Sequence, residues 1–259
     1  MNDRKIIFFD LDGTLIDHSS NSIPKSTIET IRRLKENGHI IVIATGRPPC
    51  LFYNIDKTLD IQTFIASNGR YVKHNGEVIL NDFIEPEVVN RFVTDMEKRK
   101  IDVAFESEAD FVLNKRSNNL VNQFIEYFNL KFPRIEKDFY KHNKILQMVM
   151  FYDSKDFQEI ANNYPELDFN ISCPYGIDIN KIGGMKEVGV QKVLDHLGFN
   201  RSDSIAVGDG YNDVSMIQLA GLGIAMGNAC EPLKKAADII TDSCSDDGIY
   251  NVFRKLKMI

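Results

Sequence analysis

The sequence has few cysteines, and they form none of the usual functional patterns. Its 259 residues include only four cysteines, and no two of them form a C-x-x-C pair. This spacing argues against a zinc ribbon and against a thioredoxin-like redox motif. The first residues also lack the apolar stretch of a signal peptide. We therefore expect a protein of the reducing cytoplasm.

Long apolar runs and long basic runs are also missing. No apolar stretch approaches the roughly 20 residues that cross a bilayer, so no membrane partner is expected. Acidic residues outnumber basic ones, 37 to 31, for a formal net charge of −6. Proteins that bind nucleic acid usually carry a basic patch. The mildly basic stretch 131–144 is interrupted by Glu136 and Asp138, so we interpret it as a solvated face and expect no nucleic-acid partner.

Two common catalytic motifs are absent as well. There is neither a G-x-S-x-G elbow of serine hydrolases nor a G-x-x-x-x-G-K-[ST] phosphate loop. The five histidines show no metal-ligand spacing. Candidate chemistry must therefore come from other side chains.

The sequence does contain a regular alternation of predicted apolar strands and helices. At about 150 residues per domain, the length allows one or two domains. Apolar runs at 5–10, 39–44 and 63–66 predict buried strands, and residues 24–37 and 48–59 predict helices between them. Continuous apolar strands that alternate with helices indicate a parallel sheet covered on both faces.

The middle of the chain departs from this rhythm. Asn75-Gly76 lies between two short strand-like runs, which is a strong hairpin signal. Further elements are expected as strands at 102–106, 145–152 and 177–180, and as helices at 88–96, 120–128 and 155–162. The alternation then returns, with expected helices at 186–197, 212–220 and 248–257 and strands at 204–207 and 222–225.

These patterns predict an α/β fold with an insertion. We expect a Rossmann-like, doubly wound parallel-sheet core formed by residues 1–82 and 184–259. Residues 83–183 would form an inserted α+β cap domain. The fold class follows from the two stretches of alternation that flank a mixed segment.

Two acidic loops follow predicted strands of the core. One is Asp10-Leu11-Asp12-Gly13-Thr14, and the other is Gly208-Asp209-Gly210-Tyr211-Asn212-Asp213. Open α/β folds bind ligands at the carboxyl ends of their strands, and Mg²⁺ prefers oxygen ligands. The two loops together could form one hard-cation site. The alternative is an ordinary polar turn for the first loop and, for the second, a helix cap formed by Asp209 or Asn212.

Two more segments could contact a phosphate group. Thr45-Gly46-Arg47 follows the second strand, where a hydroxyl and backbone N–H groups suit a phosphate oxygen. A capping threonine with a turn glycine explains the same residues equally well. Lys186 opens a predicted helix after Gly183-Gly184 and could supply a cation, with Lys181 as its competitor.

Taken together, these motifs resemble the haloacid dehalogenase superfamily of phosphohydrolases, in particular its Cof-type branch, subfamily IIB. The resemblance rests on DLDGT and TGR after apolar strands, an isolated lysine, and GDGYND after a later strand. It extends to Ser67-Asn68-Gly69, Ala225–Ala229, Lys234, Ala237-Asp238 and Asp247-Gly248. One departure is Glu187, which stands where members of the family usually have glycine after the lysine.

The resemblance implies a Mg²⁺-dependent phosphatase that acts on small phosphorylated metabolites, with sugar phosphates as the expected substrates. It implies that Asp10 attacks phosphorus and that Asp12 exchanges a proton with the leaving alcohol and then with water. Asp10, the Asp12 backbone carbonyl and Asp209 would bind Mg²⁺, and Asp213 would orient these ligands or reach the ion through water. Thr45, Gly46, Lys186 and Asn212 would hold the phosphoryl oxygens.

The resemblance also implies a role for the inserted cap. Its loops would select the leaving group, and it would hinge near residues 81–85 and 180–184. The sequence leaves two alternatives open. A phosphotransferase such as a phosphohexose mutase shares the aspartyl-phosphate chemistry, and a receiver domain is a non-enzymatic phosphoacceptor. Receivers are about half as long and lack the second aspartate of the DLDGT loop.

Overall fold

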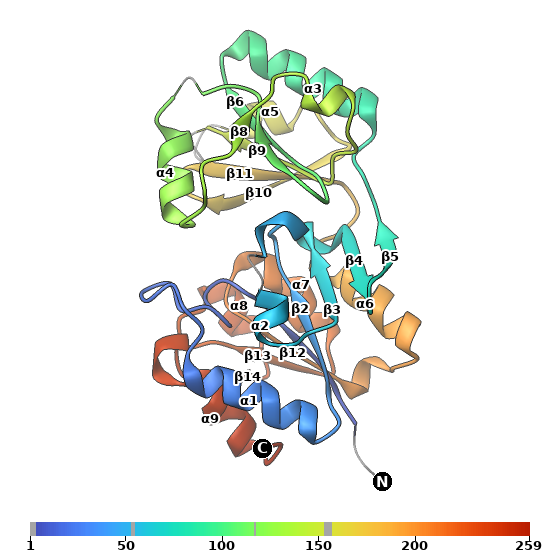
Figure 1. The fold of residues 1–259 in the computed structure, drawn as a ribbon, viewed down its shortest axis with the longest axis vertical. Helices are drawn as coiled ribbons and strands as arrows, with labels where there is room; N and C mark the ends of the chain where they lie inside the picture. The colour runs from blue at the N-terminus through green and yellow to red at the C-terminus, as the bar shows by residue number, and fades with distance from the viewer. Residues whose placement is uncertain (1–3, 53–54, 117, 153–156) are drawn as a thin grey trace. The chain divides into compact units, whose positions relative to one another are not determined.

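A computed structural model describes residues 4–52, 55–116, 118–152 and 157–259 (Figure 1). The chain divides into two compact units. The first consists of Met1–Gly46, Asn54–Leu80 and Gly184–Ile259, and the second of Arg47–Tyr53 and Asn81–Gly183. Among the described residues, no helix is long and apolar enough to cross a membrane.

The first unit is built on an eight-stranded sheet with the order β14-β13-β12-β1-β2-β3-β4-β5. Its strands are β1 (Ile6–Phe9), β2 (Ile40–Ala44), β3 (Thr63–Ala66), β4 (Tyr71–His74), β5 (Glu77–Asn81), β12 (Ser204–Gly208), β13 (Leu222–Ala225) and β14 (Ile239–Ile240). β1 lies between β12 and β2 and is parallel to both. The parallel core expected from the sequence is therefore confirmed.

One edge of this sheet is not parallel. β4 pairs with β3 in the antiparallel direction. Between β4 and β5, Asn75 and Gly76 both have positive φ, 48° and 85°. This is the backbone conformation that a two-residue hairpin turn of type I′ requires. The Asn-Gly signal thus gives a hairpin that extends the sheet on the β3 side.

Helices cover both faces of the sheet. Successive side chains of a strand point to opposite faces, so each strand contributes to two separate cores. They are α1 (Lys25–Glu36), α2 (Ile55–Thr58), α6 (Lys186–Leu197), α7 (Val214–Leu219), α8 (Glu231–Ala236) and α9 (Gly248–Lys255). Ile7 and Phe9 of β1 pack in one apolar core with α1 and α9. Ile6 and Phe8 pack in the other, with α6, α7 and α8. This is the doubly wound arrangement.

The second unit contains a six-stranded sheet with the order β10-β11-β9-β6-β7-β8. Its strands are β6 (Asp102–Glu106), β7 (Phe111–Leu113), β8 (Arg134–Ile135), β9 (Gln147–Phe151), β10 (Leu167–Cys173) and β11 (Gly176–Lys181), and its helices are α3 (Pro86–Arg99), α4 (Leu120–Tyr127) and α5 (Gln158–Ala161). β6, β9, β10 and β11 pair in the antiparallel direction. The second unit thus has the α+β architecture that was expected for this part of the chain.

Three predicted helices differ from the structure. Of the helix expected over 155–162, residues 155 and 156 lie outside the described part, and α5 covers only Gln158–Ala161. In place of one helix over 48–59, a short 3₁₀ helix (Pro49–Leu51) precedes α2, and residues 53–54 lie outside the described part. In place of a helix starting at 212, a 3₁₀ turn (Tyr211–Asp213) precedes α7.

Candidate active site

The turn after β1 brings the first acidic loop next to the second. The backbone N–H of Asp10 donates to the carbonyl of Val207 in β12, 2.9 Å away, so the two strand ends lie side by side. Gly13 has a φ of 84°, and a Cβ there would overlap the Asp209 carboxylate. Thr14 Oγ1 donates to Asp209 Oδ1 at 2.9 Å. The turn therefore requires glycine at position 13 and fixes the Asp209 side chain.

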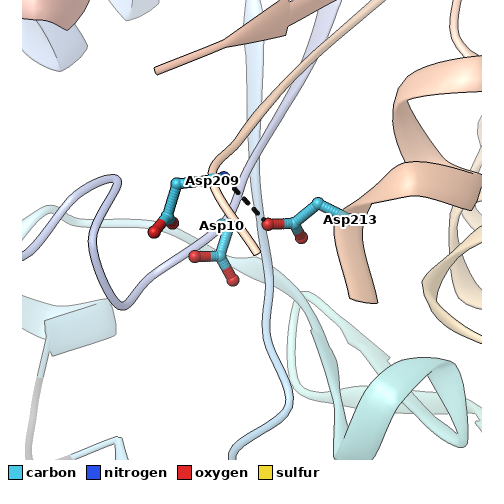
Figure 2. Close-up of side chains that lie close together, drawn as sticks. All are labelled: Asp10, Asp209 and Asp213. Carbon is cyan, nitrogen blue, oxygen red and sulfur yellow. Dashed lines mark hydrogen bonds between the residues drawn. The ribbon is translucent and has the colours of Figure 1, made fainter. Parts of the chain in front are cut away.

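The second acidic loop is organised by Asp213. Its Oδ2 accepts the backbone N–H groups of Asp209 and Gly210, at 3.0 and 2.9 Å. Figure 2 shows the first of these bonds and the three carboxylates of Asp10, Asp209 and Asp213 close together. One oxygen from each of these residues lies within 4.8 Å of the others. The side chain that caps this turn is thus Asp213, and not Asp209 or Asn212 as considered from the sequence.

Lys186 lies at the centre of these acids. Its side chain is completely buried, and its Nζ donates to Oδ1 of Asp10 and Oδ1 of Asp213, each at 2.5 Å. Lys181 instead pairs with Asp82 and Glu85 in the second unit. Of the two candidate lysines, the structure therefore brings Lys186 to the acidic loops.

Glu187 does not enter this group of charges. Both of its carboxylate oxygens accept the backbone N–H of Met185 at 3.0 Å, and Ser215 donates its hydroxyl to Oε2. Glu187 thus fastens the start of α6 to α7. Glu187, which stands where glycine was expected, therefore stabilises the helix end that carries Lys186.

Gly46 of the TGR segment lies beside two asparagines. A Cβ on Gly46 would lie 3.1 Å from Oδ1 of Asn68 and 3.4 Å from Nδ2 of Asn212. Asn212 Nδ2 donates to Asn68 Oδ1 at 2.9 Å, and the backbone N–H of Asn68 donates to the carbonyl of the buried Thr45. Three strand ends therefore converge here, since these residues follow β2, β3 and β12.

Asn68 and Asn228 were not among the site residues expected from the sequence. Asn228 Nδ2 donates to the carbonyl of Gly13 at 2.9 Å and to Asp209 Oδ2 at 3.3 Å, and its Oδ1 accepts the N–H of Cys244. Both asparagines lie in motifs that carry the family resemblance. Those motifs were the available signal, but their contacts with the acidic loops could not be inferred from spacing.

The shifted pKa values show the electrostatic cost of burying these charges together. Burial, and then repulsion from Asp213, raise the pKa of Asp10 well above its ordinary value, while Lys186 opposes the shift. Burial and Asp213 likewise raise the pKa of Asp209 to about 7. Burial alone would lower the pKa of Lys186, but Asp10 and Asp213 outweigh it and hold the lysine charged. Asp12 adds to the repulsion on Asp10.

Comparison with known proteins identifies the class. The profile of the haloacid dehalogenase-like hydrolases matches residues 7–253, and the chain belongs to this family. YkrA of Bacillus subtilis (strain 168), named as a candidate phosphatase, is 34% identical over 257 residues and 99% of each chain. The chain is thus a phosphatase of this family, a hydrolase of phosphoric monoester bonds.

Two further relatives are informative. One is named 5-amino-6-(5-phospho-D-ribitylamino)uracil phosphatase YcsE, also of B. subtilis (strain 168), and is 29% identical over 97% of this chain and 95% of its own. A solved structure of a HAD subclass IIB sugar phosphatase, BT4131, has a TM-score of 0.90 and 30% identity, covering 98% of this chain and 100% of that one.

Replacing Lys186 tests the electrostatic arrangement. Lys186→Met leaves Asp10 and Asp213 buried without their cation, so we expect a loss of about 3–5 kcal/mol in unfolding free energy at pH 7. The folded-state pKa of Asp10 is already raised, so its ionisation destabilises the fold as pH rises. The loss should therefore shrink toward pH 4. Urea unfolding in EDTA-containing buffer measures both values.

Lys181→Met is the matched control. Its ion pairs are partly exposed, and such pairs contribute at most about 1 kcal/mol. Equal losses for the two variants, or a loss at Lys186 independent of pH, would contradict the assignment of Lys186 as the counter-ion.

Proposed function

We propose that the protein is a Mg²⁺-dependent phosphatase of small phosphomonoesters, sugar phosphates above all, that works through an aspartyl-phosphate on Asp10. The observation that carries this proposal is the buried contact of Lys186 with Asp10 and Asp213, beside Asp209. A cation among carboxylates at the carboxyl edge of a parallel sheet suits the transfer of an anionic phosphoryl group.

The acidic residues fit a divalent cation. Carboxylate oxygens are the ligands that Mg²⁺ prefers, and the three carboxylates lie within reach of one ion. Asp10, the Asp12 backbone carbonyl and Asp209 would hold it. Both Asp213 oxygens already accept hydrogen bonds, which supports an orienting role for that residue. Bound there, the ion would supply charge that offsets repulsion between carboxylate and phosphate.

The reaction divides into two steps at these residues. A carboxylate oxygen of Asp10 bonds to phosphorus while the ester P–O bond breaks, and Asp12 gives its proton to the leaving alcohol oxygen. Asp12 then takes a proton from water, whose oxygen attacks phosphorus and releases inorganic phosphate from Asp10. Each residue returns to its starting state.

The remaining contacts would stabilise the phosphoryl group. Lys186 would hold negative charge on the phosphoryl oxygens, and Thr45, the Gly46 amide and Asn212 would donate hydrogen bonds as that charge spreads. The hydrogen bond from Asn212 to Asn68 supports this arrangement because it fixes the amide beside Gly46.

The substrate class rests on a narrower argument. YcsE is named for a phosphate ester of a ribityl chain, and BT4131 is described as a sugar phosphatase. Both kinds of substrate are phosphate esters of alcohols that carry further hydroxyl groups. We propose that this chain also acts on a small phosphorylated metabolite in the cytoplasm, and that the cap domain, residues 83–183, selects the alcohol.

A glycine substitution tests cation binding without relying on turnover. Gly13→Ala would push the Asp209 carboxylate aside, so Mg²⁺ should bind about tenfold more weakly or worse by isothermal titration calorimetry. Gly76→Ala is the control, since its φ of 85° imposes similar strain and its added Cβ meets no described atom within 4 Å. Equal effects on Mg²⁺ affinity would rule out a specific role for Gly13.

The nucleophile is tested directly. Asp10→Asn should lower the hydrolysis of p-nitrophenyl phosphate by about 10³-fold or more, because an amide cannot form the acyl phosphate. Treatment of the unsubstituted protein with EDTA should also stop phosphate release, and added Mg²⁺ should restore it. Asp60→Asn, an exposed acid, serves as control. Substantial turnover by Asp10→Asn would disprove the aspartyl-phosphate.

The proton donor is tested by changing the leaving group. p-Nitrophenolate leaves without a proton, whereas an alkyl alcohol needs one. In Asp12→Asn, the first-step rate on glucose 6-phosphate should therefore fall by about 10²–10⁴-fold, and the first-step rate on p-nitrophenyl phosphate far less. Rapid-quench measurement of alcohol release separates the two steps. Equal losses on both substrates would argue against Asp12 as the acid.

A further inference from the structure

Helix α6 begins with a buried lysine and without an ordinary side-chain cap. Met185, which precedes the helix, makes no side-chain capping hydrogen bond, and Lys186 is the first helical residue. The N-terminus of a helix carries partial positive charge, so a cation there is unfavourable. The backbone N–H groups at this end also lack partners within the helix. The start of α6 therefore needs an acceptor and a negative charge from another side chain.

Glu187 supplies both. Its two carboxylate oxygens accept the backbone N–H of Met185, each at 3.0 Å. An acid that reaches back from the first turn to this N–H is half of a capping box, and its charge suits the helix dipole. Gly184 leaves the space that the carboxylate occupies, since a Cβ there would lie 2.6 Å from Oε1 of Glu187.

A further bond fastens this cap to α7. The Ser215 hydroxyl donates to Oε2 of Glu187, and Ser215 belongs to α7. Asp213 stands two positions before Ser215, in the turn that precedes α7. Lys186 donates to Oδ1 of Asp213 at 2.5 Å. Two consecutive residues at the start of α6 therefore bind two residues at the start of α7.

The position of the α6 backbone decides where the Lys186 ammonium lies. A lysine side chain is a flexible stem that carries a compact point charge. Here it is completely buried, and its Nζ contacts Asp10 and Asp213 at once. A displacement of about 1 Å in an active site can lower a reaction rate about 100-fold, even when its cause lies outside the reacting groups. The bond between Glu187 and Ser215 can therefore influence the reaction without touching the substrate.

We propose that Glu187 is a positioning residue for phosphoryl transfer. Its bonds to Met185 and Ser215 hold the start of α6 against α7, so that Lys186 Nζ stays between Asp10 and Asp213. The inference rests on the phosphatase function proposed above, in which Lys186 holds the phosphoryl oxygens. It assigns a function to the one position of this motif at which the sequence departs from the usual glycine.

Glu187→Ala tests the effect on turnover. The kcat for p-nitrophenyl phosphate should fall about 10- to 100-fold, because a displaced Lys186 no longer meets the charge that develops in the transition state. The KM should change by less than about threefold, since Glu187 does not contact the substrate. Steady-state kinetics give both values. An unchanged kcat, or a loss confined to KM, would contradict the proposal.

Glu231→Ala is the matched control. Glu231 is also an acid in the first turn of a helix, α8, but it is exposed and lies 3.9 Å from Lys234. Its removal takes the same charge from a helix start without breaking a bond to α7. The kcat should therefore change by less than about twofold. A loss as large as that of Glu187→Ala would show a general charge effect and overturn the assignment.

Ser215→Ala separates positioning from helix capping. It removes the bond to α7 and leaves both contacts between Glu187 and Met185 in place. We expect kcat to fall about fivefold or more, and we expect Ser215→Ala to cost less than about twofold more when added to Glu187→Ala. Full kcat in Ser215→Ala would reduce Glu187 to a helix cap and overturn the positioning role.

A double variant tests whether Glu187 acts through Lys186. In Lys186→Met, no ammonium remains to be positioned, so adding Glu187→Ala should change the residual kcat by less than about twofold. A loss as large as in the unsubstituted protein would show that Glu187 acts independently of Lys186. Circular dichroism confirms that each variant is folded at the assay temperature, and the Ser215 test does not require Lys186→Met.

The two proposals can fail separately. If the unsubstituted protein hydrolyses p-nitrophenyl phosphate but neither Glu187→Ala nor Ser215→Ala lowers kcat, only the positioning role is wrong. If the unsubstituted protein releases no phosphate from any substrate, the proposed function is wrong, and the positioning role is wrong with it.

Discussion

The site depends on one buried cation held between carboxylates. Lys186 donates to Asp10 and Asp213 inside the first unit, where each of these charges alone would be expensive to bury. The arrangement is only partly balanced, because the pKa values of Asp10 and Asp209 remain raised. A divalent cation bound beside these carboxylates would relieve that residual repulsion. The same contact also joins residues that are widely separated in the chain.

The sheet makes this contact possible. β1, β2 and β12 are neighbours and parallel, so the loops that follow them emerge at one edge. Thr14 and Asn228 hold the Asp209 side chain by hydrogen bonds, and Gly13 leaves the space that its carboxylate occupies. The chemistry therefore rests on backbone turns and amide hydrogen bonds as much as on the acids.

Sequence patterns predicted the elements with a clear apolar period well and missed several strands. Helix α6 and strands β6 and β13 have the bounds that periodicity indicated, because each is a clear apolar pattern with turn residues beside it. β8 and β14 were missed, since two residues carry no measurable period. β10 was missed although Leu167, Phe169 and Ile171 alternate with polar residues. Its pairing with β11, more than its composition, makes it a strand.

The sequence by itself determined the fold class and the acids at the strand ends. Buried apolar strands, turn glycines and the loops after them are local features, and parallel pairing brings such loops together. Only the tertiary structure decided between Lys186 and Lys181, gave the capping role to Asp213, and brought Asn68 and Asn228 to the acidic loops. It also left both polar side-chain atoms of the buried Asn180 without a hydrogen bond to any of the described residues. These properties depend on which distant segments pack together and on what their burial leaves unpaired, and neither is written in the spacing of residues along the chain.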